Sequence, residues 1–443
     1  MHYFYDFKGF KNAQINLLRP MTLLIGRNGS GKTNVIEGVE LLSQLANGRP
    51  LYEISDIGRG SGGTFEIRGG LQGCMRKENN QQPSFELGFS INSDEEYKIS
   101  CTYQISIDFL QQPKILNEKL IVSINEKNSS QAEIFNAYRD KYSDILTVSH
   151  VDFSLNHKDP TWQLASDCSV LSRYYSKIVT ESYKEEVNKD FMCTATAANE
   201  FIKEHLMSAF VFDIHPHLMR QYERIGASQL NKDGSNLSAV LYGIKINDEN
   251  KEESQRLLPN LLNKLKQLPE EPFIGFEFIT TVADDVLLAL KCEDGVIIDA
   301  RLLSDGTLRA LAILTALETI PEHSRMVIEE LDNGVHPSRV KLLVDTIWEC
   351  SHRRNLNVLV TTHNPATLNG LTPEQLDCVV VCHYDPIEKA DKLTALPDIP
   401  YSDVLLQKGS LGDLVTRNVL ESYLMPNFEA EQQRKAQEWL DLF

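Results

Sequence analysis

A glycine-rich stretch near the N-terminus carries the residues best suited to bind a triphosphate. Residues 26–33 read GRNGSGKT, which is a glycine, four variable positions, and then glycine, lysine and threonine. An apolar run of strand length, residues 21–25, precedes this loop, and a helical pattern over residues 34–42 follows it. A strand, a glycine loop and a helix in this order present backbone N–H groups to phosphate at a helix N-terminus. We therefore predict that the loop binds a nucleoside triphosphate.

The individual positions of this P-loop predict separate roles. Lys32 is expected to reach the β- and γ-phosphates, where it also serves catalysis, and the Thr33 hydroxyl is expected to bind Mg²⁺. Further nucleotide contacts are predicted for the neighbouring positions Asn28, Gly29, Ser30, Gly31 and Asn34. The predicted cofactors are therefore ATP and Mg²⁺.

A pair of carboxylates follows a second apolar strand much later in the chain. Residues 326–330 read MVIEE. A Mg·ATP site needs one acid to hold the metal ion and another to polarise the attacking water. Acidic residues at the carboxyl end of a strand can line the phosphate crevice of a parallel sheet. We predict Glu329 as the metal ligand and Glu330 as the catalytic base.

A histidine ends the next predicted strand. Residues 358–363 read VLVTTH, a buried type of strand that finishes in polar residues. At this place the His363 side chain can donate a hydrogen bond to the γ-phosphate and respond to its loss. A lone histidine is more often structural, but its position after the acidic strand favours the γ-phosphate role.

The segment LSDGTLR, residues 303–309, opens a helix. Ser304 or Asp305 is a good N-cap, and a helix N-terminus favours an anion. An ordinary capped helix is one interpretation. The other is a second anion-binding helix, in which Ser304, Asp305 and Gly306 contact ATP held by another subunit.

The elements around these residues predict two kinds of sheet. Strand-length runs joined by polar tips indicate an antiparallel meander. They are residues 64–68, 84–91, 97–107 and 119–124. Strands and helices alternate from residue 305 to residue 362, which implies a largely parallel sheet with helices on both faces. Between the two, residues 136–142, 169–188 and 195–207 look helical and predict a helical insertion.

Composition limits the functional classes. The 443 residues are 42% hydrophobic and 24% charged, as in soluble globular proteins, and no apolar run approaches the roughly 20 residues that span a bilayer. Eight cysteines without CxxC pairs indicate thiols in a reducing compartment, so we expect a cytoplasmic protein that does not engage membranes. The net charge of −18 disfavours sequence-independent binding to DNA but does not exclude a local basic face.

Together, GRNGSGKT, LSDGT, MVIEE and TTH resemble the Walker A, signature, Walker B and H-switch motifs of the ABC/SMC-type ATPase superfamily. The sequences of these motifs most resemble those of the RecF/OLD-like “predicted ATPase” (AAA) families of bacteria. The matching segments are residues 7–12, 233–237, 303–309, 329–337, 361–365 and 410–414. The resemblance covers residues 1–120 and about 210–420.

This resemblance implies an α/β fold, an ABC-type ATPase head with a mostly parallel P-loop core sheet, an antiparallel β meander and a helical insertion. The implied regions are an N-terminal lobe at 1–124, the insertion at 125–210, a C-terminal lobe at 211–390 and a C-terminal helical region at 391–443. It also implies a head-to-tail homodimer, or a larger homo-oligomer, with two ATP molecules at the interface. Ser304 and Gly306 would then act in trans.

The resemblance also suggests what ATP hydrolysis could control. Standalone ATPases of this kind accompany toxic effectors or nucleases in anti-phage systems such as PARIS, Septu and certain retrons. We therefore expect an ATP-driven sensor or scaffold with an effector or nuclease partner from the same operon. The alternatives are a RecF-like DNA-maintenance ATPase that binds DNA across closed heads, and a nucleotide-switched interaction module with little turnover.

Two departures from the family pattern affect these expectations. Glu329-Glu330 replaces the usual Asp-Glu of Walker B, and Leu331 stands where a proline is common, so turnover is expected to be slow. No spaced acidic Toprim motif follows the last predicted strand, so we expect no intrinsic nuclease activity.

Overall fold

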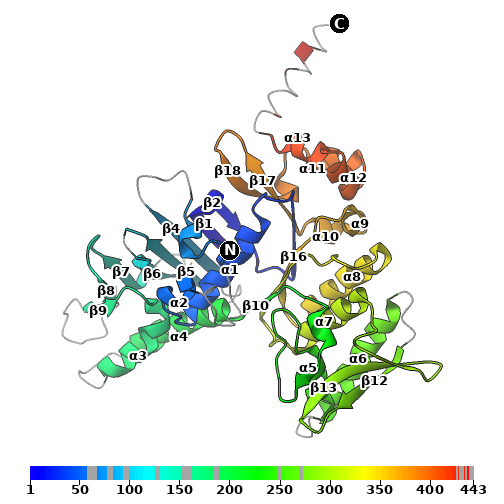
Figure 1. The fold of residues 1–443 in the computed structure, drawn as a ribbon. Helices are drawn as coiled ribbons and strands as arrows, with labels where there is room; N and C mark the ends of the chain where they lie inside the picture. The colour runs from blue at the N-terminus through cyan, green and yellow to red at the C-terminus, as the bar shows by residue number, and fades with distance from the viewer. Residues whose placement is uncertain are drawn as a thin grey trace. The chain divides into compact units, whose positions relative to one another are not determined.

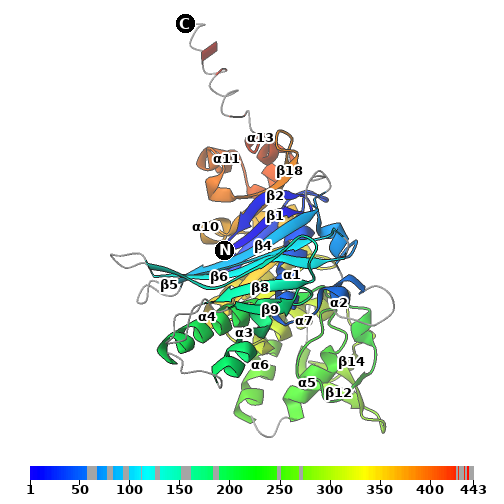
Figure 2. The same ribbon diagram turned by 90° about the vertical axis from the view of Figure 1, so that its left-hand side faces the viewer.

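The computed structural model forms two compact units, which Figures 1 and 2 show from two sides. It describes residues 1–56, 67–76, 83–92, 99–110, 112–124, 130–150, 161–182, 189–246, 251–268 and 273–425, and also 428, 434, 437 and 438. The first unit comprises Met1–Asn16, Gly31–Ala209 and Glu388–Leu393. The second comprises Leu17–Ser30, Phe210–Ile387 and Thr394–Phe443.

A parallel sheet forms the centre of the second unit. Its strands, in spatial order, are β10 (Ala209–Phe212), β15 (Arg325–Ile328), β16 (Asn357–Thr361), β3 (Met21–Ile25) and β17 (Val379–Asp385). The pairs β15–β16, β16–β3 and β3–β17 are all parallel. Every residue of β3 and β15 is buried, as expected for apolar strands covered on both faces. The carboxyl ends of these strands therefore meet at one edge.

Helices and a small antiparallel sheet complete the core of the second unit. Helix α8 (Pro337–Arg353) contacts β16 and β3, while α7 (Asp305–Thr319) packs against α6 (Lys251–Gln267) and α8. Helix α5 (Leu237–Ile246) lies on the small sheet (Figure 1), whose strands are β11 (Glu223–Arg224), β13 (Asp285–Cys292), β12 (Phe273–Thr280) and β14 (Ile297–Asp299). The C-terminal helices are α9 (Pro365–Asn369), α10 (Pro373–Leu376), α11 (Ser402–Gln407), α12 (Leu411–Thr416) and α13 (Val419–Tyr423). Two 3₁₀ turns, Leu218–Arg220 and Leu396–Asp398, link these parts.

The first unit is built on an antiparallel meander (Figure 2). Its strands are β2 (Phe10–Ile15), β1 (His2–Phe7), β4 (Ser84–Asn92), β5 (Ile99–Asp108), β6 (Lys114–Ile124), β7 (Ser130–Arg139), β8 (Ile145–His150) and β9 (Thr161–Ala165). The helices are α1 (Lys32–Ala46), α2 (Leu51–Asp56), the 3₁₀ turn Leu71–Cys74, α3 (Val170–Ser182) and α4 (Lys189–Met207). Helix α1 contacts α3, α4 and β1, which gives the unit its second layer.

These units confirm the predicted α/β fold with a parallel P-loop sheet and an antiparallel meander. The helix predicted at residues 136–142 is wrong, because Asn136–Arg139 continue β7. Phe135, Ala137 and Arg139 are buried while Asn136 and Tyr138 between them are not, which is the period of a strand. The region 125–210 thus carries further strands as well as α3 and α4. The strand predicted at 64–68 lies largely outside the described residues.

No helix in the described part of the chain is long and apolar enough to cross a membrane. Helix α7 is buried along almost its whole length, and its Leu308, Leu311 and Leu317 belong to the core of the second unit. The apolar content of the chain is therefore consistent with packing between layers.

Strand β18 (Ala390–Ala395) pairs in parallel with β2 in the first unit and carries a half-buried carboxyl group. The Asp391 N–H donates to the Gly9 carbonyl at 2.8 Å, and a methyl group on Gly9 would lie only 1.9 Å from Asp391 Oδ2. Burial raises the pKa of Asp391 from 3.8 to about 6, although Arg76 opposes the shift.

The stability of the protein should therefore depend on pH through Asp391. Because the folded pKa is higher, the folded state binds this proton more tightly, and the stabilisation it gives is lost as pH rises from 3.8 to about 6. The free energy of unfolding of the wild type, measured relative to that of Asp391→Asn, should fall as pH rises through this interval. Above the interval, the difference between the two free energies should stay constant. Urea unfolding at a series of pH values measures this difference, and a difference that stays constant across the interval would contradict the prediction.

Candidate active site

Three predicted elements leave the parallel sheet of the second unit at the same edge. Thr361 of β16 pairs with Leu24 of β3, and Val360 pairs with Ile328 of β15. The P-loop follows β3, Glu329-Glu330 follows β15, and His363 follows β16 by two residues. Ligands of open α/β sheets bind outside the carboxyl ends of the strands, so this edge is the place where these side chains could act together.

The first half of the P-loop is folded tightly against β17. Gly26 has a φ of +149°, and a Cβ there would lie 2.3 Å from the Cys382 carbonyl oxygen and 2.6 Å from Ser30 Oγ. The Cys382 thiol donates to the Ser30 carbonyl at 2.7 Å, and the Ser30 N–H donates to the Arg27 carbonyl at 3.1 Å. Only glycine fits position 26, while Asn28 and Gly29 are exposed at the tip.

The second half of the P-loop opens α1 in the first unit. Gly31 is the N-cap with a φ of +102°, and no side chain caps the helix. The first-turn residues Lys32, Thr33 and Asn34 are half-buried. An uncapped helix start with glycine at its N-cap leaves backbone N–H groups for an anion.

Helix α1 is held in the first unit by a buried carboxylate. Glu37 accepts from Lys8 Nζ and, at 3.0 Å, from Arg68 Nε. Burial alone would raise the pKa of Glu37, but hydrogen bonds from Arg68 and Lys8 lower it below its usual value. Lys8 belongs to the FKGFKN segment of the family pattern, so that segment fixes the helix that carries Lys32.

The backbone at Glu330 is in the left-handed region, with a φ of +46°. A non-glycine residue in this region costs of order 1–3 kcal/mol and persists only where its surroundings impose it. Here the Glu330 N–H donates to Thr361 Oγ1 at 2.9 Å, and the Leu331 N–H donates to the Thr361 carbonyl at 3.1 Å. The Glu330 side chain is exposed, and its Oε2 accepts from Asn333 Nδ2 at 3.2 Å.

A buried arginine donates hydrogen bonds to the turn that carries Glu330. Arg309 of α7 is 4% exposed and donates to the Glu330 carbonyl at 3.1 Å and to the Ile214 carbonyl at 2.7 Å. Burial lowers its pKa, partly offset by Asp213 and Glu330. This role was missing from the sequence interpretation. The available signal was the single charge in residues 306–317, a helical run that is otherwise uncharged and mostly apolar.

Asp332 links the acidic turn to the strand that precedes His363. It is 7% exposed, and its Oδ2 accepts from Thr362 Oγ1 at 3.0 Å. Its Oδ1 is buried without a hydrogen-bond partner among the described residues. Buried carboxylate oxygens are normally paired, so this orphaned oxygen beside Glu329 and Glu330 fits a cation at the edge.

Within the described residues, no three His, Cys, Asp or Glu side chains are placed to hold a metal ion by themselves. A Mg²⁺ ion in a nucleotide site needs only one or two protein groups, because waters and phosphates supply its other ligands.

His363 is exposed at the same edge in a turn with a fixed backbone. The Asn364 N–H donates to Thr362 Oγ1 at 3.1 Å, and Asn364 Oδ1 accepts from the Ala366 N–H at 2.9 Å to cap α9. The imidazole is therefore carried by a constrained segment and faces solvent.

The start of α7 has a side-chain cap. Ser304 is the N-cap, and its Oγ accepts from the Thr307 N–H at 3.1 Å, which settles the choice between Ser304 and Asp305. Asp305 accepts instead from Arg220 Nη2 at 2.6 Å. Gly306 is buried, and a methyl group there would lie 3.1 Å from the Gly334 carbonyl oxygen. Ser304 and Asp305 are exposed, so the helix start is open to solvent.

Comparison with known proteins identifies the family. The family described as “AAA domain, putative AbiEii toxin, Type IV TA system” matches residues 21–369, from the first residue of β3 to the last of α9. The chain belongs to this family of AAA-domain P-loop ATPases.

Curated relatives match only short segments. The DNA replication and repair protein RecF of Nocardioides sp. is 42% identical over 45 residues, which are 10% of this chain and 11% of that protein. RecF of Gloeobacter violaceus is 38% identical over 56 residues, 13% of this chain and 15% of that protein. The matched segments thus span a small part of the length of these relatives.

Among solved structures, an Smc head bound to the C-terminal winged-helix domain of ScpA is similar with a TM-score of 0.47 and 12% identity, covering 89% of this chain and 96% of that one. The SMC head domain from Thermotoga maritima gives a TM-score of 0.39 and 10% identity, with 89% and 97% covered.

Proposed function

We propose that the chain binds ATP on the P-loop and hydrolyses it with Glu330 as the general base. The observation that carries this proposal is the common sheet edge, where β3, β15 and β16 end with the P-loop, the paired glutamates and His363. The family assignment supports ATP as the nucleotide.

Each residue has a defined part in the proposed reaction. Lys32 holds the β- and γ-phosphates, and the exposed Glu330 carboxylate accepts a proton from the water that attacks the γ-phosphorus. His363 donates a hydrogen bond to a γ-phosphate oxygen and loses it when phosphate leaves. Thr33 and Glu329 would hold Mg²⁺, which when bound neutralises charge that develops on the phosphate oxygens.

The signature helix is proposed to act on a second copy of the chain. Ser304 is exposed at the start of helix α7 and Gly306 lies buried in its first turn, and a helix N-terminus favours an anion. In a head-to-tail homodimer this start would face the γ-phosphate of ATP bound to the partner, so ATP would close the dimer and hydrolysis would open it.

We further propose that this nucleotide cycle controls a separate effector protein in a bacterial defence or toxin–antitoxin system. The family description names a putative toxin of a type IV toxin–antitoxin system, and the net charge of −18 favours a protein partner over bare DNA. The RecF-like segments favour a second candidate, DNA binding across closed heads. ATP-dependent DNA binding with a steep salt dependence would select that candidate.

The first experiment compares ATP binding and phosphate release by the wild type and Lys32→Ala. Removing the ammonium group should weaken ATP binding at least about tenfold and abolish most turnover, because its charge-assisted contacts to phosphate are worth about 1.5–3 kcal/mol. Lys266→Ala, at an exposed position of α6, is the matched control and should change neither quantity. Equal ATP binding by the wild type and Lys32→Ala would contradict the proposal.

A further inference from the structure

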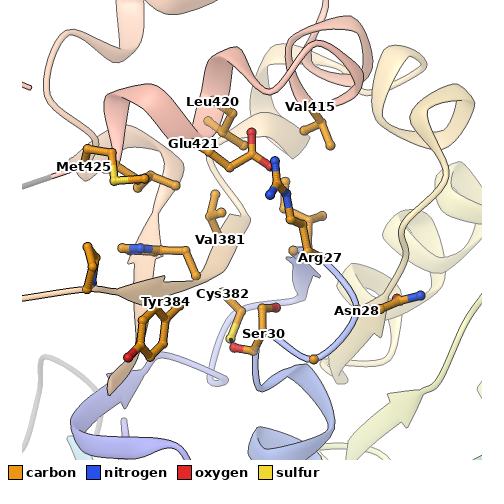
Figure 3. Close-up of a pocket in the computed structure, with 16 residues that line it drawn as sticks. Arg27, Asn28, Ser30, Val381, Cys382, Tyr384, Val415, Leu420, Glu421 and Met425 are labelled. Carbon is orange, nitrogen blue, oxygen red and sulfur yellow. Dashed lines mark hydrogen bonds and ion pairs between the residues drawn. The ribbon is translucent and has the colours of Figure 1, made fainter. Parts of the chain in front are cut away.

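A cavity of about 350 Å³ lies beside the P-loop within the second unit. The loop residues 25–30 form one wall, and the end of β17 forms another (Figure 3). The last wall comes from α12, α13 and the two residues after α13. The volume falls in the range of about 300–1,000 Å³ that is usual for sites of small organic ligands.

The walls away from the loop are mainly apolar, with His383, Tyr384 and Glu421 as their polar side chains. The apolar part includes Val381 of β17, Val415 of α12, Leu420 of α13, and Leu424 and Met425 beyond it. Such a surface gives phosphate no hydrogen-bond donors. It stabilises a planar aromatic ligand by removing it from water, at about 25 cal/mol per Å² of buried apolar area.

Arg27, a cation that borders the cavity, is paired with a carboxylate, while Glu421 Oε2 is buried without a hydrogen-bond partner among the described residues. Arg27 Nε donates to Glu421 Oε1 at 2.9 Å, and Arg27 Nη2 donates to Asn418 Oδ1. Figure 3 shows Arg27 reaching from the loop to Glu421 on α13. His383 Nε2 lies 3.0 Å from Thr394 Oγ1. With Arg27 engaged by a carboxylate, the cavity suits an uncharged ligand or the uncharged part of a larger one.

We propose that this cavity receives the base of the nucleotide whose phosphates occupy the P-loop. Loop residues 26–30, which belong to the phosphate-binding motif, also line the cavity, so one ligand can join an anionic end on the loop to an aromatic end against α13. The C-terminal helices α12 and α13 then form part of the ATP site. This assignment rests on the proposed function.

The test separates the base from the phosphates by using two probes, ATP and inorganic tripolyphosphate. Leu424→Trp fills the cavity with a larger side chain, and Val404→Trp places the same side chain at an exposed position of α11 outside it. Calorimetry should show ATP binding to Leu424→Trp weakened at least about tenfold, with tripolyphosphate affinity unchanged. Val404→Trp should bind both probes like the wild type.

The outcomes distinguish this assignment from the proposed function. Retained tripolyphosphate affinity shows that the Leu424→Trp protein is folded. Unchanged ATP affinity in Leu424→Trp would overturn the base assignment and leave the proposed function standing. A wild type that binds neither probe would overturn both.

Photolabelling of the wild type gives a measurement that needs no variant. The protein irradiated with 8-azido-ATP should be labelled on peptides that contain residues 381–386 or 415–425, and excess ATP should prevent the labelling. Labelling that ATP prevents but that falls only on other peptides would overturn the assignment.

Discussion

Replacing Glu330 by glutamine should lower the rate of ATP hydrolysis by about 10²–10⁴-fold while ATP binding persists. The amide keeps the size of the side chain and can still accept from Asn333, but it cannot accept the proton of the attacking water. The φ of +46° at this residue is imposed by Thr361 and Arg309 through backbone groups, so the substitution leaves those contacts in place. Phosphate release and equilibrium ATP binding measure the two effects separately.

The Glu330→Gln protein also reports on assembly. Because ATP is trapped without turnover, light scattering should show a mass increase from monomer to dimer on adding Mg·ATP. Glu322→Gln, at an exposed position before β15, is the matched control and should hydrolyse ATP like the wild type. Undiminished hydrolysis by Glu330→Gln would exclude Glu330 as the base, and a mass that stays monomeric would exclude the dimer model.

Replacing Arg309 by methionine should lower the free energy of unfolding by about 2–4 kcal/mol. Methionine fills similar space but donates no hydrogen bonds, so the buried Ile214 carbonyl and the part-buried Glu330 carbonyl lose the bonds that Arg309 donates. The relief of burying a cation offsets part of this loss. Hydrolysis should fall as well, because the strained turn at Glu330 loses one of its supports. Urea denaturation and phosphate release measure the two quantities.

Arg256→Met on α6 is the control for this substitution. That side chain is exposed, so its replacement should change stability by less than about 0.5 kcal/mol. Arg309→Lys should recover only part of the loss, because one ammonium group cannot reproduce the fork that reaches two separate carbonyls. A stability change for Arg309→Met no larger than that of Arg256→Met would contradict the prediction.

The parallel sheet and the meander were predictable because their signals are local. The apolar runs at β3, β15 and β16 are short, and the spacing of glycines, lysine and threonine after β3 marks the P-loop. The helix expected at 136–142 was wrong because Asn136–Tyr138 pair with β6 as part of β7, and this pairing shifts in register between Leu120 and Ile121. Local spacing does not determine which strand a segment joins.

The residues that hold the site in place could not be predicted from local sequence patterns. Arg309 bonds carbonyl groups that are 21 and 95 residues away in the chain, and Arg27 pairs with Glu421 across 394 residues. Contacts of this kind have no period in the sequence, because they depend on how distant elements pack. The residue types at the edge follow from local sequence patterns, whereas the partners that hold them there are set by the packing of elements that are distant in the chain.

The hydrogen bonds of Thr361 connect two residues that the proposed ATPase cycle uses. Its side chain and its carbonyl oxygen both accept hydrogen bonds from the turn of Glu330, and it stands two residues before His363. Thr361 therefore links the turn of Glu330, the proposed base, to the segment that carries His363, the proposed γ-phosphate sensor. If His363 shifts when phosphate leaves, the Glu330 turn would move with it. The movement that follows phosphate release would then also take the base out of its catalytic position.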